Sequence, residues 1–348
     1  MIKIINKSIS IQSKPFIIAE MSGNHNQSLE RALEILEAVY RAGASAIKLQ
    51  TYTADTITLK SDAEYFSIND KNSLWHGKNL YSLYEEAHTP WEWHKPIFDK
   101  ANELGIICFS SAFDETSVDF LEDLNVPAYK IASFENMHIP LIKKVAATGK
   151  PMIISTGMAS ISEVEEAVNT ARESGCKQLI LLKCTSNYPS DPYDSNVLTI
   201  PHLKKLFNCE VGFSDHTLGI GASLSAVAHG ATVIERHVTL NRKEGGVDSA
   251  FSLEPDELKT LVIESERAWK SLGSVKYGPN DSEKESLKFR RSIFISKDVK
   301  KGEIFSESNI KIVRPNMGLH PRYLNLVLGK KSKADYSKGT PISFEMLI

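Results

Sequence analysis

Residues 210–237 read EVGFSDHTLGIGASLSAVAHGATVIERH, and this stretch decides the fold. It holds two short strand-like runs with a helical pattern between them. Each run ends in polar side chains, namely Ser214 and His216, then Glu235 and His237. Because side chains alternate across a strand, the two members of each pair lie on one face. The unit therefore predicts parallel strands with polar groups gathered at one edge of the sheet.

The same unit recurs along the chain up to position 237. Strand-like runs rich in β-branched residues return about every 25–30 residues, at Phe16–Glu20, Ala46–Thr51, Ile106–Ser111, Ala128–Ser133, Met152–Thr156, Leu179–Thr185, Glu210–His216 and Thr232–His237. Helical patterns lie between most of them, and several stop at a glycine. Eight such strands in about 250 residues predict an α/β fold, the TIM (β/α)8 barrel. A doubly wound open sheet gives a similar count, so the period alone leaves both architectures open.

Two segments interrupt the repeat. Residues 53–87 form a long loop after the second strand, which carries the aromatic residues Tyr65, Phe66, Trp75, Tyr81 and Tyr84. A loop of this length in a compact domain is usually functional. The polar Gly/Pro/Ser stretch 273–286 indicates a linker, and the short runs and turns that follow indicate a small β-rich domain. We therefore expect a barrel domain at 1–272, a linker at 273–286 and a β-rich domain at 287–348.

The composition argues against several classes of protein. The 348 residues include 41 Lys+Arg and 43 Asp+Glu, for a net charge of −2, which disfavours a basic nucleic-acid-binding face. No apolar run approaches the roughly 20 residues of a membrane helix, and the N-terminal sequence lacks the apolar centre of a signal peptide. The four cysteines have no CxxC spacing, which disfavours a disulfide scaffold and a Cys-type zinc site. We expect a cytoplasmic protein with reduced cysteines and neither nucleic-acid nor membrane partners.

Every predicted strand ends in polar side chains, which meet on one face of a barrel. Buried lysine and glutamate are costly unless they are paired or bind a ligand. The cationic and hydroxyl groups at these ends are Lys48, Lys130, Lys183, Ser133, Ser155 and Thr156. Such a set suits a phosphate or carboxylate ligand, which needs charge and several donors together. Alternatively, each lysine pairs with a neighbouring carboxylate of Glu20, Glu135 or Glu235.

A pair of histidines ends two adjacent predicted strands. Inward-facing imidazoles of His216 and His237 can hold a divalent metal, with water and substrate completing its coordination. Two protein ligands are fewer than a structural site needs, so such a site would be an open, catalytic one. His25 is a third candidate for the same face. The alternative is that these histidines are simply hydrogen-bonded.

Several stretches, in order, resemble the nonulosonic (sialic-type) acid synthases. They are IAEMSGNHNQSLERAL, AIKLQTYTADT, CFSSAFD, YKIASFE, ISTGMAS, LLKCTSNYPS, VGFSDHTLG and VIERHVTL, and RPNMGLHP resembles the RPGxG segment of the family's antifreeze-like domain. The resemblance implies a TIM barrel followed by an antifreeze-like (SAF, β-clip) domain, in a domain-swapped homodimer. It also implies an enzyme that condenses phosphoenolpyruvate with an open-chain amino-sugar aldehyde and releases phosphate, using Mn²⁺ or Mg²⁺.

The same resemblance implies a role for individual residues. His216 and His237 would hold the metal, and Glu135 would act as general acid or base. The phosphoenolpyruvate-binding residues would be Lys48, Lys130, Ser133, Ser155 and Ser214. The sugar-binding residues would be Glu20, Gln50, Tyr188 and Arg314, with Glu20 also counted as catalytic and Arg314 reaching from the partner's C-terminal domain. The chain departs from the family pattern at Ser186, where the sialic-type enzymes carry Asn, and at Asn316-Met317, where Gly is common.

Three stretches, TPWEWHKPIF, KCTSNYP and GLHP, resemble the pseudaminic acid branch of this family. Its amino sugar is 2,4-diacetamido-2,4,6-trideoxy-L-altropyranose, and its product enters cell-surface glycans such as those of flagellin. The N-acetylneuraminic and legionaminic acid branches, which use the same chemistry on other sugars, are the nearest alternatives. More distant alternatives are a synthase of the 3-deoxy-octulosonate phosphate type, a Schiff-base aldolase using Lys130 or Lys183, and a non-catalytic ice- or glycan-binding protein.

Overall fold

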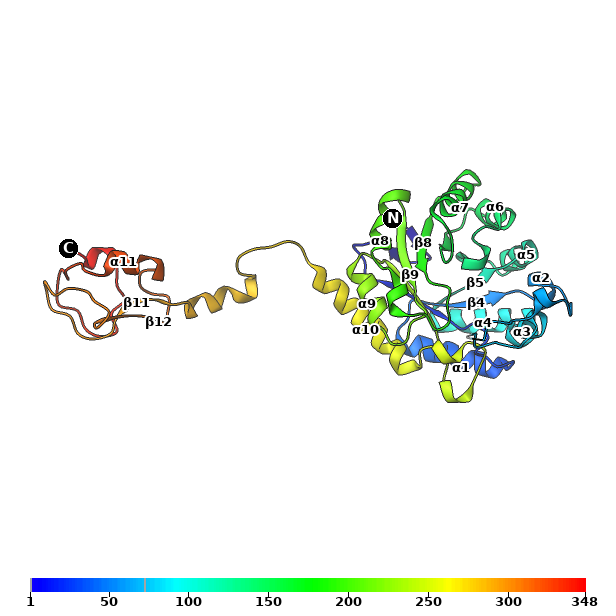
Figure 1. Cartoon of the computed structure of the whole chain (residues 1–348), viewed down its shortest axis with the longest axis horizontal. Helices are drawn as coiled ribbons and strands as arrows, with labels where there is room; N and C mark the ends of the chain where they lie inside the picture. The colour runs from blue at the N-terminus through cyan, green and yellow to red at the C-terminus, as the bar shows by residue number, and fades with distance from the viewer. Residues whose placement is uncertain (1, 72) are drawn as a thin grey trace. The chain divides into compact units, whose positions relative to one another are not determined.

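The computed structural model describes residues 2–71 and 73–348, which form two compact units that divide between Gly273 and Ser274. In the first unit eight parallel strands close into a barrel, in the order β10-β3-β4-β5-β6-β7-β8-β9 (Figure 1). They are β3 Phe16–Glu20, β4 Ala46–Thr51, β5 Ile107–Ala112, β6 Tyr129–Ile131, β7 Met152–Ser155, β8 Leu179–Cys184, β9 Glu210–Ser214 and β10 Val233–His237. Because β10 pairs with both β3 and β9, the sheet has no open edge. The predicted TIM barrel is confirmed, and the doubly wound open sheet is excluded.

Helices surround the barrel on the outside (Figure 1). They are α1 Leu29–Ala42, α4 Trp91–Leu104, α5 Glu115–Asp123, α6 Ile139–Ala147, α7 Ile161–Glu173, α8 Thr199–Phe207, α9 Gly221–Ala228 and α10 Pro255–Leu272. Their ends follow local sequence signals. At α1 the Ser28 side chain accepts a hydrogen bond from the Arg31 amide, and Gly43 ends the helix with a left-handed φ of 84°. The apolar helix faces and the outward strand residues share one continuous core.

The N-terminal end of the barrel is filled by apolar side chains. A short hairpin, β1 Ile2–Ile4 with β2 Lys7–Ile9, contributes Ile2, Ile4 and Ile9 to the same cluster as Phe16 and Phe109 of the barrel strands. The sequence analysis assigned no structure to this hairpin. Because this end is packed with hydrocarbon, a cavity is left for ligands at the opposite end, where the strands terminate.

The segment after β4, residues 53–87, is not the plain loop that the sequence predicted. It holds α2 Ala54–Ile57, the 3-10 turn Glu64–Phe66 and α3 Leu80–Ala87. We call it the β4 insertion. The ring of Tyr84 packs edge-on against Tyr52 of the barrel at 5.7 Å, which holds the insertion over the carboxyl end of β4.

The second unit is small and rich in short β pairings, as predicted. Its strands β11 Ser292–Ile295 and β12 Ile310–Val313 are antiparallel, and isolated bridges add further pairings. Its remaining helical segments are a 3-10 helix at Asp281–Phe289, a 3-10 turn at Pro321–Tyr323, α11 Leu324–Val327 and a 3-10 turn at Phe344–Met346. The linker predicted at 273–286 thus contains part of a 3-10 helix, and its bounds stay a prediction. No helix within the described ranges is both long and apolar enough to span a bilayer.

Candidate functional site

A cavity of about 500 Å³ opens at the carboxyl ends of the barrel strands. It is lined by every barrel residue to which the family resemblance gave a role, namely Glu20, Lys48, Gln50, Lys130, Ser133, Glu135, Ser155, Tyr188, Ser214, His216 and His237. The carboxyl ends of parallel barrel strands converge on one face, which is why residues up to 217 positions apart in the chain, 237 − 20, meet here.

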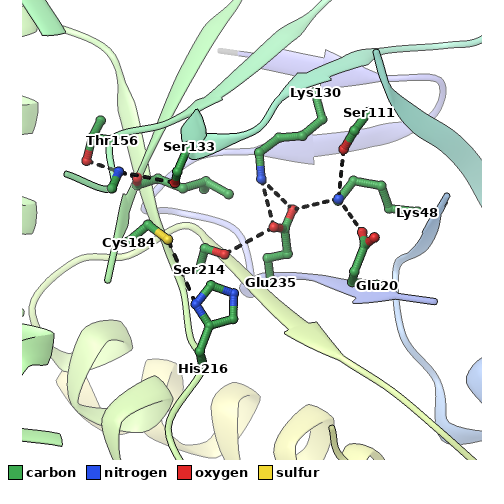
Figure 2. A network of polar contacts seen from close by, with 12 residues as sticks. Glu20, Lys48, Ser111, Lys130, Ser133, Thr156, Cys184, Ser214, His216 and Glu235 are labelled. Atoms are coloured by element: carbon green, nitrogen blue, oxygen red, sulfur yellow. Dashed lines mark hydrogen bonds and ion pairs between the residues drawn. The ribbon is translucent and has the colours of Figure 1, made fainter. Parts of the chain in front are cut away.

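A buried network of lysines and carboxylates forms the floor of the cavity (Figure 2). Lys130 contacts both carboxylate oxygens of Glu235, at 2.7 and 2.9 Å, and the Ser214 hydroxyl donates to the same carboxylate at 3.1 Å. Lys48 pairs with Glu20 and lies 3.9 Å from Glu235. The alternative interpretation, lysines paired with neighbouring carboxylates, therefore describes Lys48 and Lys130 in this structure.

The charges in this network depend on one another. Burial raises the pKa of Glu235, but the two flanking ammonium groups outweigh burial and lower it to about 2. Burial lowers the pKa of Lys48, but Glu20 and Glu235 outweigh burial and hold it above its usual value. The pKa of Lys130 is lowered, because burial and the neighbouring charge of Lys48 outweigh its attraction to Glu235. Glu235 is thus an anion shared by two lysines.

Hydroxyl groups line the next part of the cavity wall. The Gly157 amide donates to the Ser133 hydroxyl at 3.2 Å, and the buried Ser155 hydroxyl has no hydrogen-bond partner among the described residues. A Cβ atom at Gly157 would lie 2.6 Å from the Ser133 oxygen and closer still to the Ser186 oxygen. Glycine therefore leaves the space in which hydroxyls from three strand ends gather. Such a group of donors beside two lysines suits an anionic oxygen ligand.

The two predicted metal ligands face one another. The ring centroids of His216 and His237 are 5.4 Å apart, and Nδ1 of His216 lies 2.9 Å from the Thr185 carbonyl oxygen. Donation from Nδ1 to this carbonyl leaves Nε2 as a free lone pair, as in most metal-binding histidines. Among residues 2–71 and 73–348 no group of three or more His, Cys, Asp or Glu side chains surrounds a common point. The two facing imidazoles fit an open divalent site with two protein ligands and the remaining positions exchangeable.

Glu135 has a carboxyl group whose pKa differs from the ordinary value of a glutamate. It ends the short 3-10 turn Ser133–Glu135 after β6, and its Oε2 atom is buried without a hydrogen-bond partner among the described residues. Burial raises the pKa of Glu135 to about 7, and the charge of Lys130 offsets burial only in part. A carboxyl group with a pKa near neutrality can both give and take a proton under physiological conditions, which is what a general acid or base requires.

Two polar strand-end residues do not face the cavity. Lys183 points outward because its neighbours Leu182 and Cys184 take the inward positions of β8, and its ammonium donates to the Thr185 hydroxyl at 2.9 Å. Thr156 likewise donates outside the cavity, to the Leu182 carbonyl at 3.2 Å. The expectation that Lys183 and Thr156 contribute to the anion pocket is wrong.

His25 is not a third metal ligand, because it does not line the cavity. Its ring is buried against Trp93, at a centroid distance of 5.5 Å, and its Nε2 lies 3.3 Å from the Thr89 hydroxyl. Burial lowers the pKa of His25 to about 4, so the ring is neutral. Arg314 belongs to the C-terminal unit and is not among the described residues that line the barrel cavity.

The sequence analysis missed Asp248, which is buried in the cavity wall. Its Oδ2 accepts a hydrogen bond from the Ser22 hydroxyl and lies 3.5 Å from Nδ1 of His237. Burial raises the pKa of Asp248, but the neighbouring His237 imidazole and the Ser22 hydroxyl outweigh burial and lower this pKa. Asp248 follows the last strand in an irregular segment, so no strand or helix period could indicate its direction.

A second ion pair lies behind the histidines, on the outer face of the same strands. The Arg236 guanidinium contacts Oδ2 of Asp215 at 2.7 Å and donates to the Thr217 carbonyl at 2.7 Å. The Ser223 hydroxyl of α9 donates to Asp215 at 2.5 Å. These residues alternate with the cavity-facing positions of β9 and β10, so they hold the backbone that carries both histidines.

Comparison with known proteins assigns the class. Residues 35–277 match the NeuB family, and residues 290–348 match the SAF domain. The first match covers more than half of the 348 residues, so this chain belongs to the NeuB family of nonulosonic acid synthases. The predicted family, the predicted SAF fold of the C-terminal domain and the predicted synthase class of enzyme are confirmed.

Individual relatives and solved structures are similar to this chain over most of its length. The chain is 46% identical to a pseudaminic acid synthase of Campylobacter jejuni subsp. jejuni over 95% of its own length and 96% of the relative. It is 42% identical to the pseudaminic acid synthase of Helicobacter pylori, with 94% and 96% covered. A solved N-acetylneuraminic acid synthetase of Leptospira borgpetersenii superimposes with a TM-score of 0.72 at 34% identity, covering 83% of this chain and 95% of that one. The first two carry the name of the branch that the sequence indicated.

Proposed function

We propose that this protein is a pseudaminic acid synthase, which condenses phosphoenolpyruvate with 2,4-diacetamido-2,4,6-trideoxy-L-altropyranose and releases phosphate. One observation carries the proposal. Two lysines, three serine hydroxyls, a histidine pair and a carboxyl group with a pKa of about 7 line the same cavity. Identity of 42–46% to named pseudaminic acid synthases over nearly the whole chain supports the choice of sugar over the N-acetylneuraminic and legionaminic alternatives.

In this proposal the polar floor binds phosphoenolpyruvate. Lys48 and Lys130 supply positive charge, and the hydroxyls of Ser133, Ser155 and Ser214 supply donors to its phosphate and carboxylate oxygens. C3 of phosphoenolpyruvate forms the new bond to the aldehyde carbon of the open-chain sugar. Water then adds to C2, and the C2–O bond to phosphate breaks. The two lysines are already paired with carboxylates, so they do not fully neutralise the negative charge of phosphoenolpyruvate. The remaining negative charge favours a bound cation nearby.

Glu135 manages protons in this scheme, and His216 and His237 would hold the divalent metal. When bound, Mn²⁺ or Mg²⁺ would supply Lewis-acid polarisation of the aldehyde oxygen. Glu135, ionised, would take the proton from the water that adds to C2, and Glu20, Gln50 and Tyr188 would orient the sugar through its hydroxyl and amide groups. Positioning and proton transfer by residues already fixed around the cavity require little rearrangement during the reaction.

In this proposal the C-terminal unit contributes one sugar-binding residue, Arg314. Within that unit Arg314 lines a cavity of about 490 Å³ together with Arg290 and Arg291. Guanidinium groups suit polar and anionic oxygen ligands because they present several fixed donors. We propose that Arg314 contacts the sugar bound by a partner subunit, in a domain-swapped cytoplasmic homodimer with domains at 1–272 and 287–348 joined by a linker at 273–286.

A coupled assay of phosphate release tests the function. Purified protein with Mn²⁺ and phosphoenolpyruvate should release phosphate with the 2,4-diacetamido-trideoxy-altrose and form pseudaminic acid, identified by mass spectrometry. N-acetylmannosamine should react with a much lower kcat/KM. Lys130→Met should abolish turnover, whereas Lys95→Met, on an exposed ion pair of α4, should behave as wild type. A preference for N-acetylmannosamine would overturn the sugar assignment, and no phosphate release with any amino sugar would overturn the function.

A further inference from the structure

The catalytic cavity has two walls of opposite chemistry. Its floor is the polar network of the strand ends, whereas its roof comes from the β4 insertion. The roof residues that line the cavity are Ile57, Ile68, Trp75, Leu80, Leu83, Tyr84 and Ala87. These side chains are hydrocarbon or aromatic, and their polar atoms are the Trp75 indole nitrogen and the Tyr84 hydroxyl. A roof of this kind favours apolar parts of a ligand and offers little to a hydroxyl group that needs a partner.

Trp75 holds this roof in place and presents an apolar surface to the cavity. Its indole Nε1 donates to the Val247 carbonyl at 3.0 Å, which ties the insertion to the segment after β10. Its ring lies 5.8 Å from that of Tyr188, and the Tyr188 ring lies 4.5 Å from that of His216. Because the one polar atom of Trp75 is engaged, only ring carbon remains for contact with a ligand. The rings of His216, Tyr188 and Trp75 therefore lie next to one another, from the reaction centre to the roof.

The reaction fixes which end of the sugar meets the roof. The aldehyde carbon, C1, must lie beside the floor, where phosphoenolpyruvate and His216 are placed in the proposed function. The carbon chain then leads away from the floor, so its far end, C6, points toward the insertion. Burial of a methyl group at C6 against apolar side chains lowers the free energy of binding. A hydroxymethyl group at the same place loses hydrogen bonds to water, which weakens binding.

We infer that Trp75 is a specificity-determining residue, and that the roof selects amino sugars with a methyl group at C6 over those with a hydroxymethyl group. The inference rests on the proposed function, because it assumes condensation at the floor of this cavity. The roof acts on the sugar and does not contact phosphoenolpyruvate. Changes in the roof therefore alter the choice of sugar and leave the affinity for phosphoenolpyruvate intact.

Paired kinetics on two sugars test this inference. The sugars are the 2,4-diacetamido-trideoxy-altrose and its analogue with a hydroxyl group at C6. We expect wild type to prefer the 6-deoxy sugar by about 10- to 200-fold in kcat/KM, the range for one small apolar group. Trp75→Ala should lower this preference about tenfold with KM for phosphoenolpyruvate within twofold of wild type. Trp75→Phe, which keeps a ring, should retain most of the preference.

The matched control is Tyr65→Ala, an aromatic truncation on the same insertion at a side chain that is 92% exposed and outside the cavity. It should leave the preference unchanged. Ile68→Thr, which adds a hydroxyl group to the roof, should raise the relative kcat/KM for the 6-hydroxy sugar and gives a second reading if Trp75→Ala fails to fold. A preference within twofold of wild type in Trp75→Ala, or in Ile68→Thr when the alanine variant does not fold, would overturn the inference while the function stood. Failure of wild type to condense either sugar would overturn the proposed function instead.

Discussion

We expect Glu135→Gln to inactivate the enzyme and, at alkaline pH, to stabilise the folded barrel. Burial raises the pKa of Glu135 from an ordinary 4.5 to about 7, so folding favours its protonated form. Below about pH 4.5 the carboxyl group is protonated in both the folded and the unfolded chain and carries no penalty. The penalty grows as the pH rises to about 7 and is constant above it.

The size of the penalty follows from the two pKa values. They differ by about 2.5, which corresponds to about 3 kcal/mol of lost stability well above pH 7. Glu135 is only partly buried, so water in the cavity relieves some of this cost. Gln carries no charge and escapes the penalty. Between about pH 5 and pH 8.5, the free energy of unfolding of Glu135→Gln relative to wild type should therefore rise by about 2 kcal/mol.

Urea unfolding followed by tryptophan fluorescence measures this effect in the barrel alone, because all four tryptophans lie before Gly273. The matched control is Glu165→Gln, which removes the same charge from an exposed position on α7. Turnover of Glu135→Gln should fall about 10²- to 10⁴-fold, as for loss of a general acid or base. In wild type kcat should fall as the pH drops below about 7. Equal stability differences at both pH values would refute the burial argument, and retained turnover would refute the proton-transfer role.

Three further predictions concern the metal, the anion pocket and the assembly. Chelation with EDTA should abolish turnover and Mn²⁺ should restore it, while His237→Ala should stay folded but lose Mn²⁺ binding in titration calorimetry; full activity after exhaustive chelation would contradict this. Gly157→Ala should raise KM for phosphoenolpyruvate about tenfold or more, because its Cβ would displace the Ser133 hydroxyl; an unchanged KM would place the phosphate elsewhere. Arg314→Ala mixed with Glu135→Gln should regain activity once subunits exchange, since one site of each heterodimer then has both intact parts. If mass spectrometry confirms exchange and the mixture stays inactive, Arg314 does not act across subunits.

The strands were predictable because each combines a buried apolar run with a polar end. The runs at Phe16–Glu20 and Ala46–Thr51 coincide with β3 and β4 as observed. The other predicted strands differ from the observed ones by one or two residues at an end, in part because polar residues such as His216 continue the strand direction without its hydrogen bonds. Strand alternation also explains why the prediction that Lys183 faces the cavity was wrong. Counting from the inward Leu182 places Lys183 outside, and that count was available from the sequence.

The rest of the site depends on contacts that no local pattern encodes. Asp248 reaches the cavity through an irregular segment, and Trp75 is positioned by a hydrogen bond to Val247, which is 172 residues away in the chain. The side chains of Ile2, Ile4 and Ile9 in the N-terminal hairpin are buried only because they fill the closed end of the barrel. Sequence periodicity predicts which face of an element is buried, but it does not predict the partner that buries it.

The outward pair of Asp215 and Arg236 restricts how this enzyme can evolve. Neither face of β9 or β10 tolerates change near the histidines, since removing one partner leaves a buried charge uncompensated at about 3–5 kcal/mol. The β4 insertion leaves and rejoins the barrel without adding a strand to it, so its side chains and length can vary at little cost to the fold. New sugar preferences can thus arise by mutation in the insertion while the condensation step is inherited unchanged. A lineage of such enzymes can change the amino sugar it accepts without passing through inactive intermediates.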